Sequence, residues 1–132
     1  HMAQIPDHPV PAHDIDLFHT VAQVRIPAEI DFTFPPGDAA LVLSPEIERL
    51  NFRELAAGTA IGACRNGAPV SLDVRDEWGR DVSRQYFHID DGELKLRVPV
   101  MPSMLSRDAT IIRQDCLCYL MERYGEHVPK RG

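Results

Sequence analysis

The sequence predicts an α+β fold in which an antiparallel β-meander of about residues 59–100 packs against a C-terminal helix of about residues 106–124. Turn signals recur at short intervals within 59–100, and apolar residues alternate with polar ones between those turns. After the meander the apolar spacing changes to every three or four residues. One or two N-terminal strands extend the predicted sheet, and a shorter helix covers about residues 45–57.

Three dipeptides define the turns of the meander: Asn66-Gly67, Trp78-Gly79 and Asp91-Gly92. Asn-Gly and Asp-Gly favour type I′ hairpin turns, because both central residues of such a turn have positive φ. Side chains alternate between the faces of a strand, so each turn determines which residues point inward. All three turns predict one inward set: Ile61, Ala63, Val70, Leu72, Val74, Phe87, Ile89, Leu94, Leu96 and Val98, with the polar Ser83 and Gln85 at its margin.

The same register predicts which strands pair and what the outer face carries. It sets three pairs across the three turns: Ile61 with Leu72, Val74 with Ser83, and Ile89 with Leu94. Two carboxylates, Asp76 and Asp81, would also face each other, so we expect a wide solvated loop between them. The predicted outer face is polar and consists of Asp73, Arg75, Arg84, Tyr86, His88, Lys95 and Arg97, with Asp73 opposite Arg84 and Tyr86 opposite Arg97.

The N-terminal half reads as an arm followed by short elements. Residues 1–13 begin with His1-Met2, which is typical of an expression-tag remnant, and their prolines predict an extended or disordered arm. The single predicted domain spans 14–132. Asp14 could cap a helix that runs to about Val24, and a strand over 20–26 is the competing interpretation. Further strands are predicted at 29–34 and 41–43.

Capping signals place the two other helices. Ser44-Pro45-Glu46 is a typical helix start, and Gly58 follows the predicted end of this helix. Ser106 is the expected N-cap of the last helix, and Gly125 marks its end. The apolar stripe between them consists of Ala109, Ile112, Cys116, Leu120 and Tyr124.

Charge and composition exclude some classes of function. The net charge is −6, and the excess of acidic residues lies before Gly58. The sequence therefore has no basic stripe that would bind nucleic acid, and no apolar run approaches the ~20 residues of a membrane span. An odd number of cysteines, three, favours a reducing compartment. These features predict a bacterial, cytoplasmic protein.

Few residues suggest chemistry. Cys116 and Cys118 would point to opposite sides of a helix, so Cys116 is expected in the core and Cys118 partly exposed and reactive. His8, His13, Asp14 and Asp16 match no metal-ligand spacing, and a solvated arm is the simpler interpretation. The sequence contains no phosphate-binding loop, dinucleotide fingerprint or nucleophile elbow. It predicts no cofactor, no metal site and no catalytic residue.

The predicted function is a non-enzymatic protein–protein interaction domain, such as a regulator, inhibitor or accessory subunit, with another protein as partner. Trp78 lies at the tip of a polar turn, and exposed aromatics and arginines are common at interfaces. The candidate partner-binding residues are Trp78, Arg84, Tyr86, Arg97, Met101 and Met104. The alternative is a small-molecule-binding or enzymatic domain with a pocket between sheet and helices, lined by Ser83, Gln85 and His88. A homodimer through an outer strand or the sheet face is compatible with either function.

Overall fold

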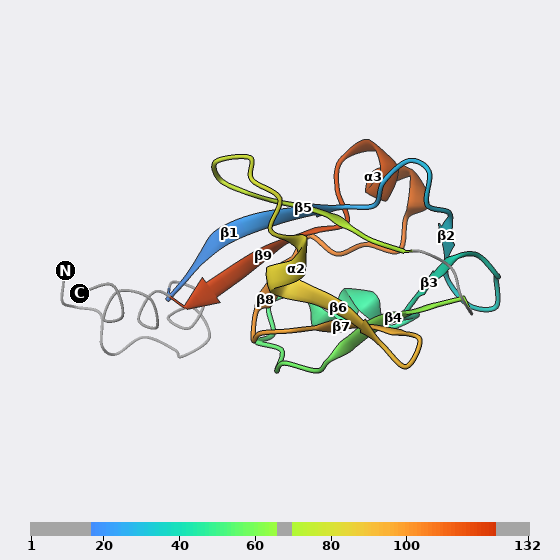
Figure 1. Cartoon of the computed structure of the whole chain (residues 1–132), viewed down its shortest axis with the longest axis horizontal. Coiled ribbons are helices and arrows are strands. Elements are labelled where there is room, and N and C mark those ends of the chain that lie inside the picture. The colour runs from blue at the N-terminus through green and yellow to red at the C-terminus, as the bar shows by residue number, and fades with distance from the viewer. Residues whose placement is uncertain (1–16, 66–69, 124–132) are drawn as a thin grey trace.

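A computed structural model describes residues 17–65 and 70–123 and shows two β-sheets with short helices between their strands (Figure 1). This is a sheet-rich α+β structure. The first sheet has four strands in the order β5-β1-β9-β8, and all its neighbours are antiparallel. The bounds of its strands are β1 Phe18–Arg25, β5 Asp73–Asp76, β8 Met101–Ser103 and β9 Cys118–Arg123.

The second sheet has five strands in the order β2-β3-β4-β7-β6, of which only β2 and β3 are parallel. Its strands are β2 Phe32–Thr33, β3 Leu41–Leu43, β4 Ala60–Cys64, β6 Phe87–Asp90 and β7 Glu93–Leu96. Small residues let β4 approach β3 closely. A Cβ atom at Gly62 would lie 2.9 Å from the Val42 carbonyl oxygen, so a larger residue there would push the two strands apart.

One hydrophobic core joins the two sheets. Val24 and Leu120 of the first sheet and Leu43 and Leu96 of the second belong to a single cluster of buried side chains. The space among the apolar side chains at its centre measures about 10 Å³, roughly the room that one water molecule needs. The core is therefore filled by side chains where the two sheets meet.

The strand pairing that the predicted meander requires is confirmed at its third turn and is wrong at its first. Asp91 and Gly92 both have positive φ, and β6 pairs with β7 in the predicted register, with Ile89 opposite Leu94. The Asn66-Gly67 turn lies outside the described residues. The strands on its two sides do not pair, since β4 lies between β3 and β7 while β5 lies beside β1 in the other sheet.

The second turn differs from the prediction in two ways. The N–H of Asp76 donates to the Arg80 carbonyl at 3.1 Å, so the segment is a tight turn and not a wide loop. After a single bridge between Arg75 and Asp81, the chain forms the helical turn α2, Ser83–Tyr86, where a strand was expected. The predicted pairs of Val74 with Ser83 and of Asp73 with Arg84 therefore do not form.

The predicted C-terminal helix is largely wrong. Helix α3 covers only Ala109–Gln114, and its N-cap is Asp108, whose carboxylate accepts from the N–H groups of Thr110 and Ile111. Residues 118–123 form β9 instead, between β1 and β8. Hydrogen bonds to β1 on one side and β8 on the other satisfy the backbone N–H and carbonyl groups of this segment. This pairing outweighs the helix-like spacing of its apolar residues.

The structure of the N-terminal half differs from three further predictions. The competing strand interpretation of residues 20–26 is confirmed by β1, so the described part of the helix expected up to Val24 is wrong. The helix expected over 45–57 is a short 3₁₀ turn, η2, Ile47–Leu50. The strand at 41–43 is confirmed as β3, whereas that at 29–34 is reduced to β2. The predicted arm, 1–13, lies outside the described residues.

No helix in the described part of the chain is long and apolar enough to cross a membrane.

Candidate functional site

The Trp78 loop, residues 76–80, joins β5 to the bridge before α2 and projects from the body of the molecule at the upper left of Figure 1. The Trp78 side chain is 70% exposed. The Arg80 guanidinium lies over its ring, 4.9 Å from the ring centroid. The remainder of the loop thus holds a large aromatic side chain in water, where it adds nothing to the core.

Asp76 organises this loop from within. One carboxylate oxygen accepts from the N–H groups of Trp78 and Arg80, both at 2.9 Å, and the other accepts from the Arg80 side chain at 2.8 Å. Gly79 closes the turn with a positive φ of 80°, which favours glycine. The Asp76 side chain is only 10% exposed although the loop is polar. Burial alone would raise the pKa of Asp76, but its bonds to Arg80 and Trp78 lower this pKa on balance.

We expect the Trp78 loop to lose its order in acid and in the Asp76→Ala variant. Because the pKa of Asp76 is lowered by folding, its contribution is complete above the unfolded value of ~3.9 and disappears as the pH falls through the lower folded value. Amide exchange at Trp78 and Arg80 should accelerate about tenfold or more in Asp76→Ala at neutral pH. Hydrogen exchange measured by NMR tests this, with Asp90→Ala as the control, since Asp90 pairs with Lys95 in the other sheet and makes no bond to the loop. Unchanged exchange at Trp78 would contradict it.

A shallow groove of about 160 Å³ runs beside the loop along the outer face of the first sheet. Its walls come from β1 residues 20–23, from β5 and the loop through residues 75–77, and from Tyr119 of β9. The amide of Gln23 donates to the Tyr119 hydroxyl at 3.3 Å and fixes that ring on the surface. The groove therefore places a second aromatic side chain, on a regular strand, near the base of the Trp78 loop.

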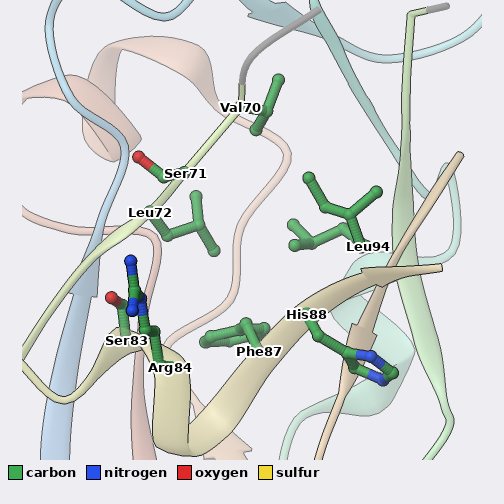
Figure 2. Close-up of a pocket in the computed structure, with 9 residues that line it drawn as sticks. Val70, Ser71, Leu72, Ser83, Arg84, Phe87, His88 and Leu94 are labelled. Carbon is green, nitrogen blue, oxygen red and sulfur yellow. The ribbon is translucent and has the colours of Figure 1, made fainter. Parts of the chain in front are cut away.

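A second open groove, of about 200 Å³, lies between residues 70–72 and the α2–β6 segment (Figure 2). Leu72, Phe87 and Leu94 form its apolar part. The predicted ligand-lining residues do not converge there. Figure 2 shows the His88 ring pointing away from Ser83 and Arg84, and Gln85 is an exposed residue that does not line this groove.

The prediction of an exposed Tyr86 is wrong, because this side chain is only 8% exposed. Tyr86 and the buried Val82 lie four residues apart across the helical turn α2, so both point inward. Burial raises the pKa of Tyr86, and the negative charge of Glu122 raises it further. The missed signal is Asp81, whose carboxylate accepts from the N–H of Ser83, two residues on, at 3.0 Å and so favours a turn where a strand was expected.

The other predicted partner-binding residues lie on separate parts of the structure. Arg84 is exposed on α2, and Arg97 is exposed after β7. Met101 is buried at 4% exposure, whereas Met104 is 64% exposed. Trp78, Arg84, Tyr86 and Arg97 do not share one sheet face, because the strands that carry or flank them belong to two sheets.

The cysteines are packing residues. Cys116 is buried as predicted, and Cys118 is also buried, so its predicted exposure is wrong. Burial raises the pKa of both thiols, which disfavours the reactive thiolate. In the described ranges, no three histidine, cysteine or acidic side chains are arranged to hold a metal ion. His8, His13, Asp14 and Asp16 lie outside those ranges.

Comparisons with protein-family models, with curated proteins and with solved structures found no match for this chain.

Proposed function

We propose that this chain is a non-enzymatic protein–protein interaction domain that binds a protein partner through the Trp78 loop. The observation that carries the proposal is the combination of exposure and order at Trp78. The side chain is 70% exposed, yet the Asp76 carboxylate bonds to the loop backbone and the Arg80 guanidinium lies over the indole ring. Trp and Arg are the residue types most enriched among interface hot spots.

The order of the loop matters because binding costs conformational entropy. A loop whose turn is already closed by the Asp76 carboxylate loses little freedom when a partner covers Trp78. The adjacent groove, with Gln23 and Tyr119, extends the surface that a partner could cover. Its open, shallow form suits a protein surface better than a small ligand, which binds in an enclosed cavity.

The small-molecule alternative has less support. The centre of the core offers only about 10 Å³, far below the ~300 Å³ of a typical ligand cavity. Two larger hollows, of about 310 Å³ beside β3 and β4 and about 570 Å³ between β2 and α3, are open to solvent rather than enclosed. The Figure 2 groove is larger but open, and Ser83 and His88 do not point toward a common position in it.

Capture experiments with variant proteins test the proposal. A hot-spot contribution of at least ~2 kcal/mol predicts that Trp78→Ala weakens partner binding about 30-fold, while the unfolding midpoint barely changes. Phe52→Ala is the matched control, since Phe52 is also an exposed aromatic residue, at 52% exposure. The immobilised wild-type and variant proteins would be compared by quantitative mass spectrometry of proteins retained from the cells in which the chain naturally occurs.

Fluorescence then measures binding directly. Trp78 is the only tryptophan in the chain, so its emission reports on this loop alone. Titration with a purified captured protein should shift the emission to shorter wavelength and protect it from a soluble quencher. A partner that binds Trp78→Ala as tightly as the wild type would contradict the proposal, as would the absence of any protein captured selectively by the wild type.

A further inference from the structure

The two sheets have four outer edges, formed by β5, β8, β2 and β6. Natural proteins protect such edges with short strands, prolines or covering segments. The outer side of β5 is covered, since the Val82 N–H donates to the Val74 carbonyl at 2.8 Å. β8 contains Pro102, and β2 has only two residues. Among the described residues, no segment beyond the adjoining α2 bonds to the outer side of β6, and the strand contains no proline.

Hydrogen bonds on the two sides of β7 show which residues of β6 direct their main-chain N–H and carbonyl groups toward β7. The Arg97 N–H donates to the Tyr86 carbonyl at 2.8 Å, whereas the Leu96 N–H donates away from β6, to the Thr59 carbonyl at 2.9 Å. Bonded and non-bonded pairs alternate along an antiparallel ladder. Tyr86, His88 and Asp90 therefore direct their main-chain groups toward β7. Phe87, Ile89 and Asp91 direct theirs outward, away from the sheet.

Four outward main-chain groups at this edge have no partner in the described ranges. They are the Phe87 carbonyl, the N–H and carbonyl of Ile89, and the N–H of Asp91. The Phe87 N–H already donates to the Ser83 carbonyl. The Ile89 side chain is 44% exposed and borders the groove of Figure 2. The edge is thus ready to pair with another strand.

We propose that a second copy of this chain pairs antiparallel with β6, so that two five-stranded sheets become one continuous sheet. Ile89 faces Ile89 of the second copy, and their N–H and carbonyl groups bond reciprocally. The Asp91 N–H of each copy reaches the Phe87 carbonyl of the other. This arrangement uses all four free groups and does not need the Phe87 N–H, which is already bonded.

Charge at the two ends of β6 favours a second copy over an unrelated strand. Arg84 precedes the strand on α2 and Asp91 follows it, and within the described structure neither forms an ion pair. A two-fold antiparallel pairing places the Arg84 end of each copy beside the Asp91 end of the other. Opposite charges then meet at both ends of the interface, whereas parallel pairing would bring like charges together. Pairing also removes the exposed Ile89 side chains from water.

Light scattering over a concentration series, coupled to size-exclusion chromatography, tests this proposal. The mass should rise from 14.8 kDa toward twice that value. Arg84→Glu and Asp91→Arg should each weaken dimerisation about tenfold or more, and the double variant should restore it. Ile89→Pro removes an N–H that the monomer does not use, so it should abolish the dimer and leave the monomer folded. Arg49→Glu, at an exposed site on η2, is the control and should leave the dimer intact.

Other outcomes overturn the proposal. Light scattering that shows only the 14.8 kDa monomer at every concentration up to about 1 mM would do so. A dimer that survives Ile89→Pro, or one that the charge-swapped double variant does not recover, would place the contact elsewhere. Trp78→Ala should still dimerise. A dimer lost in Trp78→Ala but kept in Ile89→Pro would locate it at the Trp78 loop, so failure here and failure of the partner-binding proposal are distinguishable.

Discussion

Leu117→Ala should lower the free energy of unfolding by about 2–5 kcal/mol, the range found for buried leucines that leave a cavity. Leu117 is fully buried, at 0% exposure, and its N–H donates to the Val24 carbonyl at 2.7 Å, just before β9 begins. In a continuous helix over residues 106–124, Leu117 would lie beside the apolar stripe rather than in it. The substitution therefore tests whether Leu117 lies in the core just before β9 begins.

Ile111→Ala is the matched control for this measurement. Ile111 lies on α3 in the same segment, but its side chain is 43% exposed. Alanine also has the higher helix propensity, so the stability of this variant should remain within about 0.5 kcal/mol of the wild type. Urea unfolding followed by circular dichroism gives both values. Equal effects of the two substitutions would contradict the placement of Leu117 in the core.

Arg113→Ala should destabilise the protein by about 2–3 kcal/mol, because one guanidinium ties α3 to the chain that leaves β1. Its Nη1 donates to the carbonyls of Ile26 at 3.2 Å and Pro27 at 3.0 Å, and its Nη2 donates to that of Ile30 at 2.5 Å. The same group lies over the Phe32 ring, 4.7 Å from its centroid. Removing it leaves partly buried carbonyls without a donor.

Two further variants separate geometry from charge. Arg113→Lys keeps the charge but loses the planar fork that reaches several carbonyls at once, so it should recover less than half of the loss. Arg49→Ala removes an exposed arginine whose partner is the exposed Glu46, just before η2, and should cost less than about 0.5 kcal/mol. Urea unfolding midpoints measure all three. If Arg113→Lys matched the wild type, charge alone would account for the effect and the carbonyl contacts would not.

The alternation of apolar residues predicted burial better than it predicted pairing. Val74, Phe87, Leu94 and Leu96 are buried as expected, although β5 and β6 belong to different sheets. The alternation of apolar residues within one strand shows which side chains point inward. It is the same whichever strand lies alongside, so it does not identify the pairing partner. Ile89 and Ala63 are exceptions on that face, since both are exposed near the end of a strand.

The candidate site was predicted in part. The exposure of Trp78 is confirmed, because a polar turn offers nothing local to bury an indole. Its rigid setting could not be read from the letters, since it depends on Asp76 bonding to groups two and four residues away in one particular turn. Tyr86 was placed on the wrong side because α2 interrupts the strand periodicity.

The sequence by itself determined the Asp91-Gly92 hairpin, the inward face of most strands and the exposure of Trp78, because each follows from interactions within a few residues. Only the tertiary structure decided which sheet each strand joins, and it made residues 118–123 a strand. Those choices depend on hydrogen bonds between segments far apart in the chain, such as Phe18 opposite Arg123, and local spacing carries no information about such partners.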